Sequence, residues 1–144
     1  MSTRKDKFNQ RDRFFMNLAF NLARDRLGLT GENPSVGCVI VKNDKVISLG
    51  QTGINGRPHA EFNAIKSCKY NLKDAKMYVS LEPCTHYGKT PPCSNLIIKS
   101  KIKEVIFSIT DLDKRTHSKS FKVFKEKNIK VKSGLLKNEA NKIY

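Results

Sequence analysis

The first part of the chain carries an apolar pattern with a helical period. From Asp12 to Leu27, apolar residues recur at steps of three and four, which places them on one side of a helix. They are Phe14, Phe15, Leu18, Ala19, Leu22, Ala23 and Leu27. Gly28 follows directly, and a glycine commonly stands just after the end of a helix. The pattern therefore predicts an amphipathic helix over 12–27, preceded by a flexible N-terminal arm over 1–11.

Short apolar runs rich in β-branched residues follow this helix. Val36–Val41 and Val46–Leu49 flank Asn43-Asp44, a pair that is typical of tight turns, so the two runs predict a β-hairpin. Further strands are expected over 76–81, 104–109 and 129–132. Helices are expected over 60–70, 93–99, 118–127 and 136–143. Because strands that alternate with helices form parallel crossovers, this order predicts an α/β fold with a mixed sheet and helices on both faces.

The length and composition agree with one cytoplasmic domain. The chain has 144 residues, enough for one core, and we expect a single domain over 12–144. No apolar run approaches the ~18–20 residues that a membrane-spanning helix needs. Met1–Arg13 is polar and charged, unlike a secretory signal, so a cytoplasmic location is expected. Thiols stay reduced there, and clustered cysteines more often bind metal than form disulfides.

The chain is strongly basic. It has 28 Lys and Arg residues against 13 Asp and Glu, a formal net charge of +15. Such a balance favours an anionic partner. The lysines are spread along the chain, however, and they match no nucleic-acid motif, so a solvated surface accounts for most of them. We do not expect a nucleic-acid partner, and a phosphorylated small molecule would fit the charge as well as RNA.

Residues with metal-site chemistry stand in two short motifs, His59-Ala60-Glu61 and Pro83-Cys84 followed by Cys93. A catalytic zinc ion takes three protein ligands and keeps a fourth position for water. One imidazole and two thiols suit zinc, which predicts that His59, Cys84 and Cys93 bind it. A carboxylate beside that water is what a hydrolase needs to move protons, and Glu61 is the candidate. This is the pattern of zinc nucleobase deaminases, although eight residues separate the cysteines here instead of the usual two.

A structural zinc site is the main alternative for this cluster. Structural sites usually close with four protein ligands, often in Cys-x-x-Cys pairs. The remaining donors in the chain are His86, His117, Cys38 and Cys68. Cys38 lies in an apolar strand and Cys68 on a predicted helix, so both are expected in the core, and His117 is expected on a surface loop. The sequence therefore favours a catalytic site with three ligands.

The reaction predicted for this site is hydrolytic deamination of a heterocycle. Glu61 would take a proton from the attacking water and pass it to a ring nitrogen and to the leaving amine. The polar loop between the cysteines contains His86 and Lys89, whose donors could hold an exocyclic group or a phosphate. Residue chemistry alone leaves open whether this loop contacts the substrate or is an ordinary surface loop.

The same loop gives the chain a specific resemblance. Pro83–Cys93, with the sequence PCTHYGKTPPC, closely resembles the signature of the deaminase domain of the bifunctional riboflavin-biosynthesis deaminase/reductase. The stretches over 33–41, 56–61 and 78–84 resemble its N-P-x-V-G-C-V-I-V, G-x-P-H-A-E and Y-V-T-L-E-P-C motifs. His-Ala-Glu alone marks only the wider cytidine-deaminase-like superfamily. The resemblance extends over residues 12–143, which is nearly the whole chain.

This resemblance implies a three-layer α/β/α cytidine-deaminase-like fold with a five-stranded mixed sheet. It implies Zn²⁺ bound by His59, Cys84 and Cys93, with Glu61 as the proton shuttle. The implied substrate is a phosphorylated aminopyrimidine, 2,5-diamino-6-ribosylamino-4(3H)-pyrimidinone 5′-phosphate. Its deamination would give 5-amino-6-ribosylamino-uracil 5′-phosphate and ammonia. The substrate contacts that the resemblance implies are Asn33, Ala60, His86, Lys89 and Asp111.

The chain departs from the family pattern in two ways. After the fourth strand the family has Asp-Pro-Asn-Pro, whereas this chain has Asp111-Leu112-Asp113-Lys114. The family protein also continues into an NADPH-dependent reductase domain, for which 144 residues leave no room. We therefore expect no NADPH binding by this chain. A separate reductase or a second copy of the chain is the expected protein partner.

Two other functions agree with parts of the sequence. Deamination of adenosine in tRNA agrees with the charge of +15, although such enzymes typically have the short Pro-Cys-x-x-Cys spacing. A non-catalytic zinc-binding scaffold for a reductase would keep the metal ligands, but it would not need the carboxylate of Glu61. The presence of that carboxylate favours an enzyme.

Overall fold

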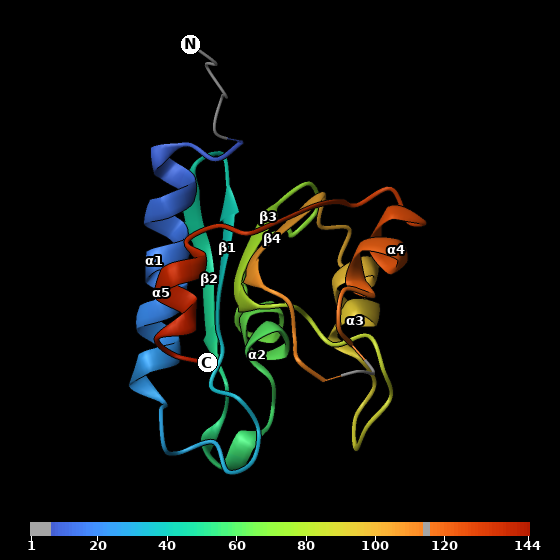
Figure 1. The fold of residues 1–144 in the computed structure, drawn as a ribbon. Helices are drawn as coiled ribbons and strands as arrows, with labels where there is room; N and C mark the ends of the chain where they lie inside the picture. The colour runs from blue at the N-terminus through green and yellow to red at the C-terminus, as the bar shows by residue number, and fades with distance from the viewer. Residues whose placement is uncertain (1–6, 114–115) are drawn as a thin grey trace.

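The computed structural model describes residues 7–113 and 116–144 (Figure 1). Its elements in chain order are α1 (Gln10–Asp25), β1 (Gly37–Lys42), β2 (Lys45–Gln51), the 3₁₀ helix η1 (Ile54–Gly56), α2 (Ala60–Ser67), β3 (Lys76–Leu81), α3 (Cys93–Lys99), β4 (Glu104–Ile109), α4 (Ser120–Lys125), β5 (Lys130–Ser133) and α5 (Lys137–Asn141). Among these residues, no helix has the length and apolar character needed to cross a membrane.

The strands form one five-stranded sheet with the order β2-β1-β3-β4-β5. β1 pairs antiparallel with β2 and with β3, whereas β3, β4 and β5 run parallel. Between β1 and β2, Asn43 and Asp44 have φ angles of 51° and 62°, which a type I′ turn requires. The parallel strands are connected by α3 and α4, as crossovers demand. The predicted hairpin and the predicted mixed sheet are both confirmed.

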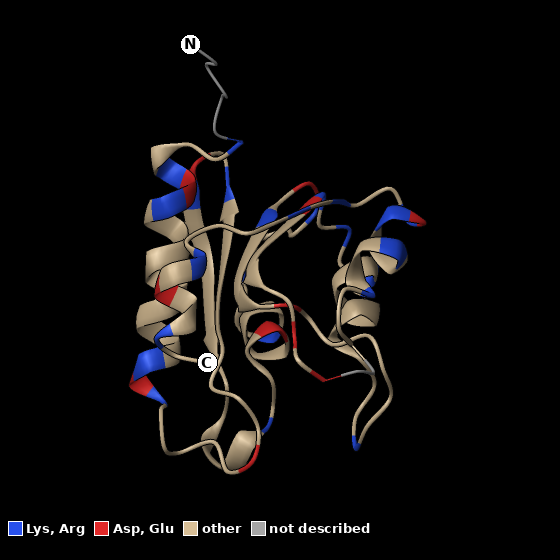
Figure 2. Ribbon diagram, in the orientation of Figure 1, with Lys and Arg blue, Asp and Glu red and all other residues tan. Residues whose placement is uncertain are grey.

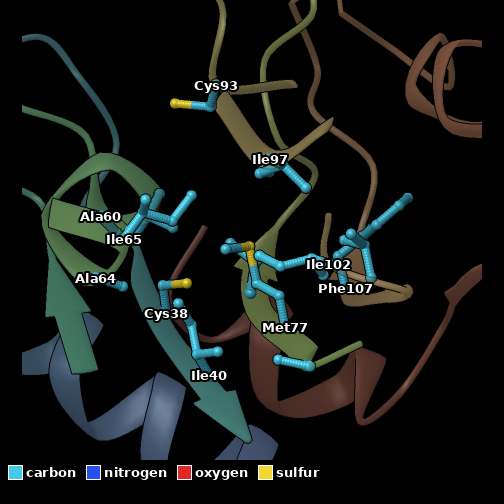
Figure 3. Packing of buried hydrophobic residues seen from close by; sticks show 14 of the residues in the cluster. Cys38, Ile40, Ala60, Ala64, Ile65, Met77, Cys93, Ile97, Ile102 and Phe107 are labelled. Carbon is cyan, nitrogen blue, oxygen red and sulfur yellow. The ribbon is translucent and has the colours of Figure 1, made fainter. Parts of the chain in front are cut away.

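Helices cover both faces of the sheet (Figure 1). α1 and α5 lie side by side on one face, and α2, α3 and α4 cover the other. Because side chains alternate along a strand, Met77 and Val79 of β3 enter the core cluster beneath α2 and α3, and Tyr78 enters the cluster beneath α1. Figure 3 shows residues from α2, α3, β1 and β3 meeting in the first of these clusters. The fold is the predicted three-layer α/β/α arrangement.

A glycine brings the second helix close to the sheet. A Cβ atom on Gly50 of β2 would lie 2.2 Å from the carbonyl oxygen of Ala60 and 2.5 Å from the amide nitrogen of Ala64. Only a residue without a side chain allows this approach. The contact fixes the first turn of α2 against the sheet, and with it the position of His59 and Glu61.

The first helix differs from its predicted boundaries. α1 covers 10–25, so each end lies two residues earlier than expected. The Asn9 side chain accepts a hydrogen bond from the Asp12 amide, and the Asp12 side chain accepts one from the Asn9 amide, which forms a capping box. The predicted arm is therefore wrong for residues 10 and 11, and Phe8 just before the helix is buried. The arm over 1–6 lies outside the described residues.

The helices α2, α4 and α5 are shorter than predicted because the neighbouring backbone is not helical. α2 ends before Cys68, whose ψ of 128° is extended. α4 begins only after Ser118, and α5 only after Leu136, because both residues have a left-handed φ, 58° and 57° respectively. β3, α3 and β4 have the predicted bounds, and the other strands differ from theirs by at most two residues.

The charged residues do not gather on one element. Figure 2 shows Lys and Arg positions in both helical layers and on the loops. It also shows acidic positions along the segment that follows β4. This distribution agrees with a solvated basic surface, and some of the acids lie near the ends of the central strands.

Candidate active site

Three potential metal ligands meet near the starts of two helices. His59 directly precedes α2, Cys93 is the first residue of α3, and Cys84 lies in the loop after β3. The Nδ1 atom of His59 lies 3.4 Å from Sγ of Cys93 and 3.7 Å from Sγ of Cys84. Figure 3 shows the Cys93 sulfur directed away from Ile97, one turn further along the same helix. The fold thus brings together the three side chains that the sequence analysis selected.

This donor set fits a zinc ion. In a tetrahedral site, Zn–S bonds of ~2.3 Å and Zn–N bonds of ~2.0 Å place a sulfur and a nitrogen ligand about 3.5 Å apart. The observed distances of 3.4 and 3.7 Å lie on either side of that value. The three ligand atoms lie within 4.8 Å of one another, and no other described His, Cys, Asp or Glu joins them. Three protein ligands are typical of a catalytic zinc site.

The remaining donors lie apart from this group. Cys38 is fully buried in the core, as predicted. Cys68 is only half-buried, because α2 ends before it, so its predicted core position is wrong. His117 is exposed, as predicted, and its Nδ1 donates a hydrogen bond of 2.8 Å to the carbonyl oxygen of Asp111. None of these residues closes the cluster as a fourth ligand.

The two cysteines of the cluster are hydrogen-bonded to each other. The backbone N–H of Cys93 donates to Sγ of Cys84 at 3.2 Å. The pKa of Cys84 is lowered, first by a hydrogen bond from the Cys93 thiol and then by one from His59. The pKa of Cys93 is raised by the same thiol–thiolate hydrogen bond and by burial. Cys84 thus accepts hydrogen bonds that favour its thiolate form, and thiolate is the form that binds metal.

Glu61 lies in the first turn of α2 and is only 4% exposed. Burial, followed by the charge of Cys84, raises the pKa of its carboxyl group to about 7. A carboxyl group with a pKa near neutrality takes up and releases protons readily at physiological pH. Because Glu61 faces the same cavity as His59 and Cys84, it can exchange protons with a molecule bound there.

That cavity has a volume of about 470 Å³ and collects most of the predicted substrate contacts. Those that line it are Asn33, His86, Lys89 and Asp111. Ala60 does not line it, since its side chain is fully buried in the core beneath α2. The fold therefore brings four of the five expected contacts to one place, and their contact with a substrate stays a prediction.

Asn33 lines the cavity from a loop that is hydrogen-bonded to the loop before His59. Its Nδ2 atom donates a hydrogen bond of 2.9 Å to the carbonyl oxygen of Gly56. Gly56 has a left-handed φ of 99°, and a Cβ atom there would lie 2.6 Å from the same Nδ2. A glycine is required for this close approach. The amide of Asn33 thus fixes one wall of the cavity.

Glu82 accepts several hydrogen bonds that hold one wall of the site, and the sequence analysis did not select it. It is 3% exposed, and its carboxylate accepts hydrogen bonds from the amides of Asp111, Ser118 and Ser120 and from the Ser120 hydroxyl. The lengths of the amide bonds are 3.1, 2.8 and 3.1 Å. An acidic residue at the end of an apolar strand was the available signal. Glu82 organises the segment in which this chain departs from the family pattern, of which Lys114 lies outside the described residues.

The same segment contains one of the expected contacts and is hydrogen-bonded to another. Asp111 begins it, and burial raises the pKa of its carboxyl group. The Nδ1 atom of His86 lies 2.8 Å from the hydroxyl oxygen of Thr116, which is fully buried. This hydrogen bond links the loop between the cysteines to the segment that Glu82 organises.

Arg57 is a second residue that the sequence analysis did not select. It lines the cavity, and its Nη1 atom donates a hydrogen bond of 2.7 Å to the hydroxyl of Thr90 in the loop between the cysteines. A cation two positions before the histidine of His-x-Glu was the signal that could have identified it. Arg57 brings a fixed positive charge to a site whose other strong cation is Lys89.

Comparison with known proteins identifies relatives over most of the chain. The model of the cytidine and deoxycytidylate deaminase zinc-binding region matches residues 9–109. The riboflavin biosynthesis protein RibD of Bacillus amyloliquefaciens is 42% identical over 132 residues, which are 92% of this chain and 36% of that protein. The diaminohydroxyphosphoribosylamino-pyrimidine deaminase of Buchnera aphidicola (subsp. Schizaphis graminum) is 42% identical over 92% of this chain and 90% of its own length.

Solved structures agree with these matches. The Thermotoga maritima diaminohydroxyphosphoribosylaminopyrimidine deaminase/5-amino-6-(5-phosphoribosylamino)uracil reductase has a TM-score of 0.86 and 38% identity, over 92% of this chain and 39% of that one. The dCMP deaminase of cyanophage S-TIM5 has a TM-score of 0.66 at 18% identity, over 85% of this chain and 95% of its own, and shows a shared fold. Together the comparisons confirm the family, the fold, the kind of enzyme and the zinc cofactor expected from the sequence.

Proposed function

Because this chain belongs to the zinc-binding cytidine and deoxycytidylate deaminase family, we propose that it deaminates 2,5-diamino-6-ribosylamino-4(3H)-pyrimidinone 5′-phosphate. The products are 5-amino-6-ribosylamino-uracil 5′-phosphate and ammonia. Support for this substrate comes from the Buchnera relatives, which carry the name of that deaminase and match over 88–90% of their own length. The chain spans only 36–37% of the RibD relatives from Bacillus and Aquifex, so their remaining activity is not assigned to it.

The observation that carries the proposal is the buried carboxyl group of Glu61 beside the His59, Cys84 and Cys93 cluster. These three residues are the proposed zinc ligands. When bound, zinc supplies Lewis-acid chemistry that makes a water molecule acidic enough to attack at neutral pH. The protein part of the reaction is then proton transfer and orientation of the substrate.

Glu61 is the proposed proton carrier. Water adds to the ring carbon that bears the amino group, forming the new C–O bond, and Glu61 accepts the proton that the water releases. Glu61 delivers this first proton to the ring nitrogen. It then transfers the proton of the added hydroxyl to the amine, so that the carbonyl forms, the C–N bond breaks and ammonia leaves. A pKa of about 7 lets one carboxyl group perform both the uptake and the delivery.

The remaining lining residues orient the heterocycle. Asn33, His86 and Asp111 supply an amide, an imidazole and a carboxyl group around the same cavity. Such groups can pair with the amino and carbonyl substituents of an aminopyrimidine. Asn33 is held by its bond to Gly56, His86 by its bond to Thr116, and the Asp111 carboxyl group by the amide of Asp113. These bonds fix the groups before a ligand arrives, which lowers the entropy lost on binding.

The direct test is ammonia release by the zinc-loaded protein from this substrate, with Glu61→Ala as the inactive control. The proposal expects release by the unaltered chain and none above background in the variant. Adenosine in tRNA is assayed in parallel, because the net charge of +15 favours an anionic substrate of some kind. Conversion of tRNA adenosine to inosine, with the aminopyrimidine left unchanged, would replace the proposed function.

The proposed product also defines a partner. It is the substrate named in the description of the reductase half of the Thermotoga protein, of which this chain matches 39%. We therefore expect the product to pass to a reductase. Sedimentation of this chain with such a reductase tests for a stable complex, and conversion by the two unassociated proteins would indicate free transfer.

A further inference from the structure

A second chamber, called the outer chamber, adjoins the cavity at the site. The outer chamber has a volume of about 400 Å³ and shares Glu32, Asn33, Arg57 and Lys89 with the inner cavity. Its remaining lining residues are Ile54 and Asn55 of the 3₁₀ helix. A ligand with its reacting end beside Glu61 can therefore extend past these shared residues toward the surface.

Charge is unevenly distributed between the two chambers. The acids Glu61, Glu82, Asp111 and Asp113 line the inner cavity and do not line the outer one. Arg57 and Lys89 line both chambers. Among the described residues that line the outer chamber, the acidic one is Glu32, which is exposed. The positive groups thus mark the passage to the outer chamber, at the end of the site away from the acidic wall.

The guanidinium group of Arg57 is held in place without being neutralised. Its Nη1 donates to the Thr90 hydroxyl at 2.7 Å, and its Nη2 lies beside Gly88 of the same loop, 3.7 Å from where a Cβ atom there would stand. Among the described residues, no carboxylate forms an ion pair with Arg57 or Lys89 within 4.0 Å. A fixed, unpaired guanidinium facing a chamber is suited to binding phosphate in a bidentate manner.

We propose that Arg57, with Lys89 beside it, forms a phosphate subsite in the outer chamber and makes the enzyme select phosphorylated substrates. The inference rests on the proposed function for the direction in which the substrate lies: the amine toward Glu61 and the 5′-phosphate toward Arg57. The ribose then spans the passage between the two chambers. A phosphate beside the inner wall would instead meet Glu82, Asp111 and Asp113.

The test compares the phosphorylated substrate with its dephosphorylated form. Arg57→Ala is expected to lower kcat/KM for the phosphorylated compound by about 10- to 100-fold, mainly through KM, because a hydrogen bond to a charged group is lost. The value for the dephosphorylated compound should stay within about twofold. Arg57→Lys should recover part of the loss, since it restores the charge but not the bidentate geometry.

Two controls separate phosphate binding from loop positioning and from general charge. Thr90→Val removes the hydrogen bond that holds Arg57 but keeps the guanidinium, so it should cost much less of the preference for phosphate than Arg57→Ala does. Lys69→Ala removes one positive charge just beyond the opposite end of α2, and this variant should also prefer the phosphorylated substrate. If Arg57→Ala weakens both substrates equally, or if Thr90→Val reproduces its effect, the subsite is wrong and Arg57 only positions the loop.

A binding measurement keeps this inference distinct from the proposed reaction. Titration calorimetry with ribose 5-phosphate and with ribose should show binding of the phosphorylated sugar alone, and Arg57→Ala should abolish it. That result without any deamination would keep the subsite and reject the proposed substrate. Deamination by a protein whose affinity for ribose 5-phosphate does not depend on Arg57 would reject the subsite and keep the reaction.

Discussion

The Nδ1 atom of His59 lies 3.4 Å from the Sγ atom of Cys93, although 34 residues separate them in the sequence. α2 and α3 start beside each other because both pack on the same face of the sheet. Ligands held at helix starts lose little freedom when they bind a metal, because the backbone around them is already fixed. This pairing is the basis of the first two predictions.

Replacing Glu61 with Gln should abolish most turnover and leave the metal in place. The amide has nearly the same shape but cannot accept the proton, so kcat should fall by roughly 10²- to 10⁴-fold, the usual contribution of general acid–base catalysis. Ammonia release measures the loss, and mass spectrometry of the metal content should give the same zinc per chain as the unaltered protein. A variant that kept its activity would show that another group carries the proton.

Replacing Cys84 with Ser should remove zinc and lower stability. The substitution takes away one of the three proposed zinc ligands, and metal binding contributes to the folding free energy of such sites. Cys68→Ser is the matched control, since Cys68 is half-buried and lies outside the cluster. Zinc content and the thermal midpoint are measured for both. Equal zinc content in the two variants would contradict the assignment of Cys84 as a ligand.

Replacing Glu82 with Gln should loosen the segment over 111–120. A Gln side chain has one acceptor oxygen, so some of the amide and hydroxyl donors that now face the carboxylate would lose their partner. We expect a loss of about 1–3 kcal/mol in the free energy of unfolding, the cost of leaving buried donors unpaired. Urea unfolding measures this loss, and hydrogen exchange at the Ser118 and Ser120 amides should become faster.

The same variant should also raise KM, because Asp111 and Thr116 lie in the loosened segment. Glu126→Gln, on the exposed end of α4, is the control and should change neither stability nor KM. A Glu82→Gln protein with normal stability and slow exchange at both serines would show that the carboxylate is dispensable.

Stability should fall at alkaline pH because of a buried tyrosine. The hydroxyl of Tyr78 donates a hydrogen bond of 2.6 Å to Asp12, and burial, followed by this bond and the Asp12 charge, raises the pKa of Tyr78 far above its usual value. Below about pH 10 the folded and unfolded chains both keep the proton, so the contribution is fully present. Above that pH the unfolded chain loses the proton first, and stability should fall by about 1.4 kcal/mol per pH unit.

Comparison with Tyr78→Phe isolates this effect from the titration of other groups. The variant should be less stable at pH 8, because Asp12 loses its buried donor, and the difference between the two proteins should shrink above pH 10. Urea unfolding at pH 8, 9, 10 and 11 provides the measurement. A difference that stayed constant to pH 11 would mean that Tyr78 titrates normally in the folded chain.

Much of this architecture follows from local patterns. The apolar spacing of α1, the short apolar runs of the strands and the Asn43-Asp44 turn are properties of neighbouring residues, and each predicted element is present. The zinc ligands were selected for a similar reason, since an imidazole, two thiols and a nearby carboxylate are recognisable by residue type alone. Errors occurred mainly at helix ends, where a cap such as Asn9 or a left-handed residue such as Leu136 decides the boundary.

The sequence by itself determined the kinds of element and the residues able to bind the metal. Only the tertiary structure decided that β1 lies between β2 and β3, that Glu82 holds a distant segment by its amides, and that Arg57 faces the outer chamber. The physical reason is the range of the interactions. Helix and strand periods depend on residues a few positions apart, whereas the partners of a buried carboxylate or the walls of a cavity come from segments 20 to 40 residues away, whose approach depends on how the layers pack.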